Sequence, residues 1–135
     1  MKLVEIWNSV SAWSTISKLK KNPKLAYRLL KYEKRVDKEL QVCEKQRQAC
    51  VYEVRGVEPG TEVEALLEGT PEYATFLAKF NEFMQAESDL QWIGISMDDL
   101  LDGLGAETGN VLSEYDIELL EPFFTEPMQP ESPQA

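Results

Sequence analysis

Apolar side chains recur every three or four residues over residues 3–20, which is the spacing of the buried stripe on an amphipathic helix. The stripe consists of Leu3, Ile6, Val10, Trp13, Ile16 and Leu19. Asn22 and Pro23 follow, and an asparagine N-cap with proline at the first helical position is a typical helix start. We therefore expect one helix over residues 3–20 and a second helix that begins at Pro23.

The second helix is expected to be long, because its apolar stripe continues to Val54. The stripe consists of Leu25, Leu29, Tyr32, Val36, Leu40, Cys43, Arg47, Cys50 and Val54, of which only Arg47 is polar. About thirty helical residues extend about 45 Å, whereas the first helix extends about 27 Å. An antiparallel hairpin of the two leaves the distal part of the second helix to be covered by a later segment, a second copy or another partner. The candidate partner-binding residues of this part are Leu40, Cys43, Arg47 and Cys50.

The helical pattern stops between Gly56 and Gly69. A turn over residues 57–61 and an alternating stretch over residues 63–67 predict a short extended segment. Thr70 and Pro71 repeat the pattern of an N-cap residue followed by proline, and they predict the start of a third helix. The apolar face of this helix is the most aromatic in the chain and consists of Tyr73, Phe76, Leu77, Phe80, Phe83 and Met84.

The next stretch combines a strand pattern with a helix start. Residues 90–95 are rich in apolar and β-branched side chains and predict a strand. Ser96 and Asp99 have the spacing of a capping box, so a short helix over residues 97–101 is expected. The loop predicted to follow contains Gly103, Gly105, Gly109 and Asn110.

A last helix is capped by Ser113, runs through Leu120 and ends at Pro122. The acidic, proline-rich residues 125–135 are expected to be disordered and dispensable for folding. The patterns together predict one domain over residues 1–124 that is mainly α with a small β element. Its long antiparallel helical hairpin is followed by shorter helices and a short strand or hairpin.

Charge is distributed very unevenly along the chain. Residues 1–55 carry 13 Lys and Arg against 6 Asp and Glu, net +7, whereas residues 56–135 carry one Lys against 18 acids, net −17. The acidic half can cover the basic hairpin, bind the basic half of a second copy, or mimic nucleic acid on a basic host protein. The basic residues can also serve as a face for nucleic acid, although the net charge of −10 disfavours such a polyanion. The candidates for partner binding near the hairpin turn are Lys20, Lys21, Lys24 and Arg28.

The chemistry of the side chains argues against catalysis. The chain has no histidine, the commonest general base and metal ligand, and Cys43 and Cys50 stand too far apart on one helix for a disulfide. The acids at 98, 99 and 102 fit a helix N-terminus better than a cation loop, so we expect no metal and no cofactor. No apolar run reaches the length of a membrane span, and the first residues lack a signal-peptide core. We therefore expect no enzyme, no membrane contact and no export.

Four segments in order, Asn22–Tyr27, Gly69–Tyr73, Trp92–Ser96 and Leu119–Phe124, resemble small proteins of unknown function encoded by tailed bacteriophages and prophages. The resemblance covers residues 2–124 and carries no functional residues. It implies a non-enzymatic accessory protein that acts through protein–protein contacts in virion assembly or structure, in the cytoplasm of the bacterial host or within the virion. The alternative is a phage inhibitor that blocks a host protein, and a homo-oligomer is expected in either case.

Overall fold

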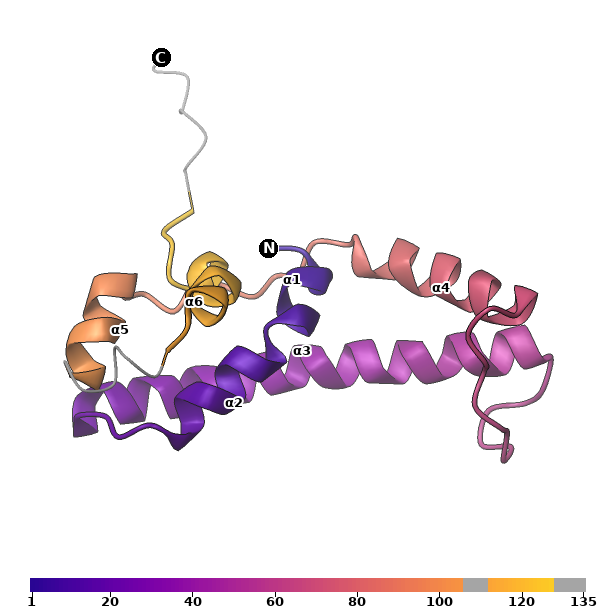
Figure 1. The fold of residues 1–135 in the computed structure, drawn as a ribbon, viewed down its shortest axis with the longest axis horizontal. Coiled ribbons are helices and arrows are strands. Elements are labelled where there is room, and N and C mark those ends of the chain that lie inside the picture. Colours follow the sequence, from indigo (N-terminus) through magenta and orange to yellow (C-terminus); the bar gives the residue numbers. More distant parts are fainter. Residues whose placement is uncertain (106–111, 128–135) are drawn as a thin grey trace, which may run out of the picture. The chain divides into compact units, whose positions relative to one another are not determined.

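The computed structural model describes residues 1–105 and 112–127, and 66% of these residues are helical (Figure 1). The helices are α1 (Leu3–Asn8), α2 (Val10–Lys18), α3 (Pro23–Arg55), α4 (Pro71–Met84), α5 (Met97–Leu104) and α6 (Glu114–Leu120), followed by the short 3-10 helix η2 (Glu121–Phe123). The mainly helical class is confirmed, and the predicted small β element is not seen in the described residues, which contain no strand and one isolated β-bridge between Lys2 and Glu87.

The chain divides into two compact units. Unit 1 comprises Met1–Trp7 and Arg35–Asp89, and unit 2 comprises Asn8–Lys34 and Leu90–Ala135. The long helix α3 contributes its distal part to unit 1 and its first turns to unit 2. Each unit is built from an N-terminal segment, a part of α3 and a later segment of the chain.

The starts of the two longest helices follow the predicted cap chemistry. The backbone N–H of Leu25 donates to Asn22 Oδ1 at 2.8 Å, and Pro23 is the first residue of α3. The backbone N–H of Tyr73 donates to Thr70 Oγ1 at 3.2 Å, with Pro71 first in α4. In both cases the side-chain oxygen satisfies a backbone donor that has no partner within the helix.

The two later helices are capped by serine. In α5 the caps are reciprocal, because Ser96 Oγ accepts from the Asp99 N–H at 3.2 Å and Asp99 Oδ2 accepts from the Ser96 N–H at 3.0 Å. In α6, Ser113 Oγ accepts from the Asp116 N–H at 3.1 Å. Helix α5 continues three residues beyond the predicted end and takes in Gly103, which had been placed in the following loop.

The predicted helix over residues 3–20 is divided in two at Ser9, which is fully buried. Leu3 and Ile6 of α1 belong to the core of unit 1, whereas Trp13 and Ile16 of α2 belong to that of unit 2. The stripe of apolar positions is continuous in the sequence, but it serves two cores, and the helix is interrupted where the chain passes from one unit to the other.

In unit 1, α4 runs along the distal part of α3 (Figure 1). Two ion pairs join α4 to the end of α3. Arg55 of α3 pairs with Glu72 at 3.0 Å, and Glu53 of α3 pairs with Lys79 at 2.8 Å. The buried side chains of these two helices in unit 1 are Val36, Cys43, Cys50, Phe76, Phe80 and Met84. The aromatic stripe of α4 therefore provides the cover that the distal stripe of α3 needs.

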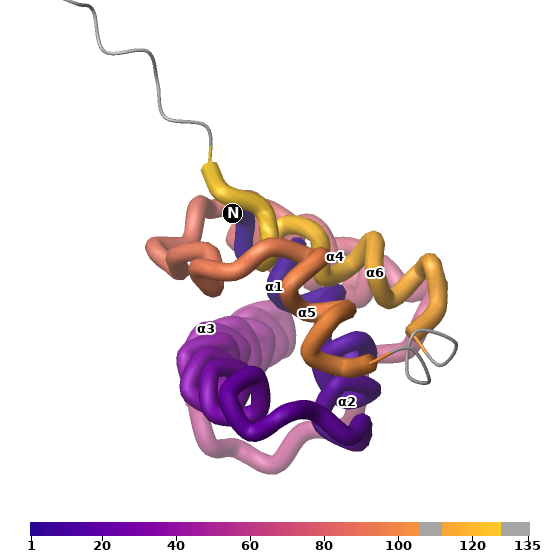
Figure 2. Tube along the Cα trace, turned by 90° about the vertical axis from the view of Figure 1, so that its left-hand side faces the viewer, coloured from indigo at the N-terminus to yellow at the C-terminus, as the bar shows by residue number. Residues whose placement is uncertain are grey.

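Unit 2 has an aromatic core. The Trp13 ring lies 5.8 Å from the Tyr32 ring, 5.3 Å from Phe123 and 6.1 Å from Phe124, measured between centroids. Figure 2 shows α2, α5 and α6 grouped around the first turns of α3. Phe123 and Phe124 are both buried, so the ordered chain of unit 2 extends at least to these residues.

The predicted strand over residues 90–95 is an extended segment without a partner strand. Its backbone groups bond to side chains and to η2 instead. The Tyr32 hydroxyl donates to the Gln91 carbonyl at 2.5 Å, the Arg28 guanidinium donates to the Ile93 carbonyl at 3.3 Å, and the Ile93 N–H donates to the Phe123 carbonyl at 2.9 Å. The segment is extended because these bonds hold it against α3 and η2.

Residues 56–69 form turns and irregular backbone rather than a regular extended element. The Arg55 guanidinium donates to the carbonyls of Glu64 and Ala65, each at 3.2 Å, and so fastens this segment to the end of α3. The predicted loop residues Gly109 and Asn110, and residues 128–135 of the predicted disordered tail, lie outside the described residues.

Candidate functional site

The structure separates the two groups of predicted partner-binding residues. Cys43 and Cys50 lie in the core of unit 1 with 0% and 2% of their surface exposed, so these two side chains cannot meet a partner in this fold. Burial raises the pKa of the Cys43 thiol, and the nearby Glu39 carboxylate adds to the effect. The prediction for both cysteines is therefore corrected. The physical reason is that both side chains are buried in unit 1, where α4 runs alongside the distal part of α3.

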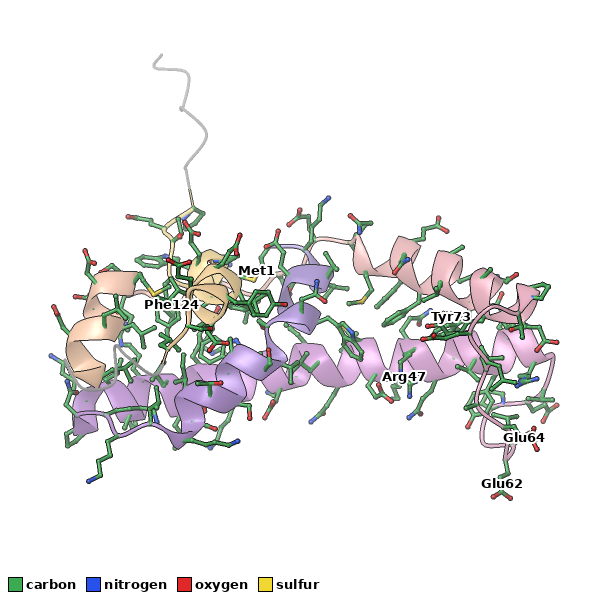
Figure 3. The ribbon with its side chains drawn as sticks, viewed as in Figure 1. Met1, Arg47, Glu62, Glu64, Tyr73 and Phe124 are labelled. Carbon is green, nitrogen blue, oxygen red and sulfur yellow. The ribbon has the colours of Figure 1, made fainter. Side chains whose placement is uncertain are left out.

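Leu40 and Arg47 are half-buried on the same helix. The Arg47 guanidinium donates two hydrogen bonds to the Glu44 carboxylate, at 2.8 and 2.6 Å. This hydrogen bonding is the main cause that lowers the pKa of the Glu44 carboxyl. A cavity of about 450 Å³ in unit 1 is lined by Arg47, Tyr73 and neighbouring residues of α3 and residues 63–66 (Figure 3). Its one cation is already paired within the chain, so the cavity offers little to an anionic partner.

The second predicted group lies in unit 2, around the turn between α2 and α3. Lys20, Lys24 and Arg28 are exposed, and Lys21 is half-buried. Lys21 donates to the Leu19 carbonyl at 2.8 Å, and Arg28 donates to the Ile93 carbonyl at 3.3 Å. All four cations lie close to the start of α3, and their role in partner binding stays a prediction.

The outward side of α3 in unit 2 forms a surface that we call the basic face. It consists of Lys24, Tyr27, Leu30, Lys31 and Lys34. Their spacing puts them on the side of the helix opposite the buried Leu25, Leu29 and Tyr32.

Two apolar side chains stand in the middle of the basic face. Tyr27 is 66% exposed and Leu30 is 56% exposed, and the Lys31 ammonium lies 5.6 Å from the centre of the Tyr27 ring. Sequence reasoning missed both residues, because they fall outside the apolar stripe. Their departure from the stripe, among lysines, was the signal that could have found them.

The lysines of the basic face take part in no ion pair among the described residues. Residues 8–34 contain seven Lys and Arg against the single acid Glu33. The ion pairs of Met1, Arg47, Arg55 and Lys79 all lie in unit 1, and none of them involves a lysine of the basic face. Cover of the basic hairpin by the acidic half, one of the possibilities left open by the sequence, therefore produces no ion pair at the basic face.

The outward side of α6, together with the first residue of η2, forms a second surface, the acidic face. It consists of Glu114, Glu118 and Glu121, with Tyr115 beside them at 64% exposed. The spacing of four and three residues places the three carboxylates on one side of the helix, and the fully buried Leu120 points to the other side. These carboxylates likewise have no cationic partner among residues 1–105 and 112–127.

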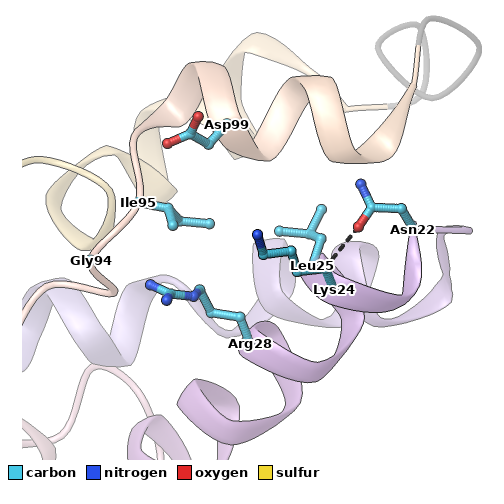
Figure 4. A pocket seen from close by; sticks show the side chains of 7 residues that line it. All are labelled: Asn22, Lys24, Leu25, Arg28, Gly94, Ile95 and Asp99. Atoms are coloured by element: carbon cyan, nitrogen blue, oxygen red, sulfur yellow. Dashed lines mark hydrogen bonds between the residues drawn. The ribbon is translucent and has the colours of Figure 1, made fainter.

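A cavity of about 370 Å³ adjoins the basic face in unit 2 (Figure 4). It is lined by Asn22, Lys24, Leu25, Arg28, Gly94, Ile95 and Asp99. The hydrogen bond from the Ser96 backbone lowers the pKa of the Asp99 carboxyl, and Arg28 contributes a smaller effect. A Cβ atom at Gly94 would lie 3.0 Å from Arg28 Nη1, so the glycine leaves room for the guanidinium. The cavity combines two cations and one carboxylate without a nucleophile placed beside a base.

Comparison of the chain with protein-family models, with curated proteins and with solved structures finds no match. Within the described residues, no group of three or more potential metal ligands comes together. No helix in the same part of the chain is long and apolar enough to cross a membrane. The functional argument therefore depends on the two charged faces of unit 2.

Proposed function

We propose that this chain is a non-enzymatic accessory protein of a tailed bacteriophage that acts through protein–protein contacts in virion assembly or structure. The observation that carries the proposal is the basic face, where Tyr27 and Leu30 are exposed among lysines that lack ion pairs in the described chain. Tyrosine is enriched at the centre of protein interfaces, and polar and charged side chains stand mainly at the rim. The order of sequence segments shared with small phage proteins supports the phage origin and the place of action, in the host cytoplasm or the virion.

A protein fits the basic face better than nucleic acid does. Phosphates are bound by Lys and Arg, and an exposed leucine such as Leu30 contributes nothing to that contact. The net charge of −10 also repels a long polyanion such as nucleic acid. An acidic patch on a protein carries fewer charges, so the long-range repulsion from it is weaker. A partner with an acidic rim and an apolar centre matches the face in both respects.

The experiment that tests this function is site-specific photo-crosslinking in infected bacterial cells. A photoreactive residue replaces Leu30 in one version of the protein and Leu67 in a control version. Leu67 is 70% exposed but belongs to unit 1. We expect a crosslinked virion-structure protein from position 30 alone. Crosslinks from position 30 to nucleic acid, or the same products from both positions, would contradict the proposal.

The second candidate function is inhibition of a host protein, and the acidic face supports it. Three carboxylates in a row without cationic partners in the described chain can occupy a basic site that normally binds phosphates. In this case a photoreactive residue in place of Tyr115 should capture a host protein with a basic binding site. Substitution of the three glutamates by glutamine should abolish that capture, whereas capture that persists would exclude acidic mimicry.

A further inference from the structure

Unit 2 carries two faces of opposite charge that point away from one common core. The inward side of α3 contributes Tyr32, the segment after α6 contributes Phe123, and the centres of these rings lie 6.3 Å apart. Because the basic face lies on the opposite side of α3 from Tyr32, and the acidic face lies on the opposite side of α6 from Leu120, the two faces cannot meet within one chain (Figure 2).

The two faces are complementary in charge, and the basic face is the longer of the two. Lys24 and Lys34 are ten residues apart, a rise of about 15 Å along α3, and Glu114 and Glu121 are seven residues apart, a rise of about 10 Å. Each face has exposed apolar surface beside its charges, Tyr27 and Leu30 on one and Tyr115 on the other. Lysines on one helix can therefore pair with glutamates on the other while Tyr115 packs near Leu30.

We propose that the basic face of one copy of this chain binds the acidic face of α6 in a second copy. The contact uses two different surfaces of unit 2 that point away from each other, so it is head-to-tail and leaves one free face of each kind at the ends of the assembly. The inference rests on the proposed function in that it names a second copy as a partner of the basic face. Addition of copies at the free ends would suit an assembly protein.

This contact replaces the interface that the sequence suggested for a homo-oligomer. That interface needed an uncovered distal stripe on α3, but Cys43 and Cys50 are buried in unit 1. The basic and acidic faces are both exposed, and neither has ion pairs within the described chain to give up on association. Association therefore does not require ion pairs within the described chain to be broken.

The contact should be weak and sensitive to salt. Two helix faces of this length bury less than the roughly 1,200 Å² of a stable interface, and each exposed ion pair contributes little. Two copies of net charge −10 also repel each other at long range, so the attraction acts only between the facing surfaces. We expect association at about 100 µM protein in low salt, and a dissociation constant at least about tenfold higher near 0.5 M salt, where the Debye length falls to about 4 Å.

The test uses two charge-reversed variants and sedimentation velocity at low salt. The basic-face variant is Lys31→Glu with Lys34→Glu, and the acidic-face variant is Glu118→Lys with Glu121→Lys. All four positions are exposed, and lysine near the C-terminal end of α6 suits the helix dipole, so both variants should fold. Circular dichroism checks that they do.

Matched controls carry the same net charge with the substitutions in unit 1. Lys2→Glu with Lys45→Glu lowers the net charge from −10 to −14, as the basic-face variant does, because each change removes one positive charge and adds one negative charge. Glu62→Lys with Glu64→Lys raises it from −10 to −6, as the acidic-face variant does (Figure 3). The controls separate the effect of a face from that of total charge.

We expect the wild type and both controls to form species larger than a dimer that grow with concentration, and each face variant alone to be monomeric. An equimolar mixture of the two face variants should associate again, because the intact basic face of one variant can bind the intact acidic face of the other and the two reversed faces are also opposite in charge. A monomeric wild type, a monomeric mixture, a wild type that stops at the dimer, or controls that dissociate as the face variants do would each overturn the inference. A monomeric wild type whose position 30 still crosslinks to a virion protein would overturn this inference and leave the proposed function standing.

Discussion

Substitution of Gly103 by alanine tests the closest packing in unit 2, where α5 lies against the first turns of α3. Gly103 is in the last turn of α5, and a Cβ atom there would clash with Leu25 Cδ2 and lie 3.1 Å from both Leu25 Cβ and Cγ. The Asn22 N–H donates to the Gly103 carbonyl at 3.1 Å, so a displacement of α5 would also stretch this bond. Leu25 is 6% exposed and has little room to move away.

The expected sign is opposite to that of helix propensity. Glycine to alanine within a helix normally stabilises by about 1 kcal/mol. Overpacking costs about 1–3 kcal/mol, and the upper end applies here because the contact involves Leu25 Cβ, which moves only with its backbone. Subtraction of the propensity gain from about 3 kcal/mol leaves an expected loss of about 2 kcal/mol in the free energy of unfolding.

Urea unfolding followed by circular dichroism at 222 nm measures this loss, and a double-mutant cycle assigns it. The cycle compares Gly103→Ala in the wild type with Gly103→Ala in the Leu25→Ala background, where the Cγ and Cδ atoms are absent. We expect the second effect to be close to zero or stabilising. A stabilising Gly103→Ala in the wild type, or an equal loss in both backgrounds, would refute the proposed clash.

Three further predictions concern the helix caps and the tail. Asn22→Ala removes the acceptor of the Leu25 N–H and should destabilise the chain by about 1 kcal/mol, and superimposable thermal melts of mutant and wild type would contradict this. The folded state lowers the pKa of Asp99, so its stabilising effect is present above the unfolded pKa and is lost as the pH falls through the lower folded value. Asp99→Asn should therefore weaken the decline of helix content below about pH 4, and an unchanged acid profile would count against it. Removal of residues 128–135 should leave the melting temperature unchanged, because the buried Phe124 is retained, and a fall of several degrees would show that the tail packs.

The starts of four helices could be predicted from the sequence because their cause is local. An asparagine, threonine or serine cap acts on the backbone within three residues, and a following proline fits the first turn without any help from distant residues. Asn22, Thr70, Ser96 and Ser113 all cap as the sequence indicated. The cations near the turn before α3 were found for the same reason, since they are close neighbours in the sequence.

The faces of the candidate site were harder to predict. The sequence showed a basic half and an acidic half, but whether they neutralise each other depends on which side of each helix points outward. The buried Leu29 and Leu120 fix those sides through contacts with distant segments. The departure of Tyr27 and Leu30 from the apolar stripe marked them in the sequence, and the folded chain shows that both are exposed.

The amino-acid sequence by itself determined the helical character, the caps and the separation of charge, because these depend on residues a few positions apart. The tertiary structure decided what each apolar stripe packs against. Residues 90–95 have the composition of a strand but lie where the Tyr32 hydroxyl, Arg28 and the Phe123 carbonyl satisfy their backbone groups, so no strand forms. The division of the first helix at Ser9 and the burial of Cys43 in unit 1 have the same origin, since burial is shared among segments far apart in the chain and no local pattern records the partner.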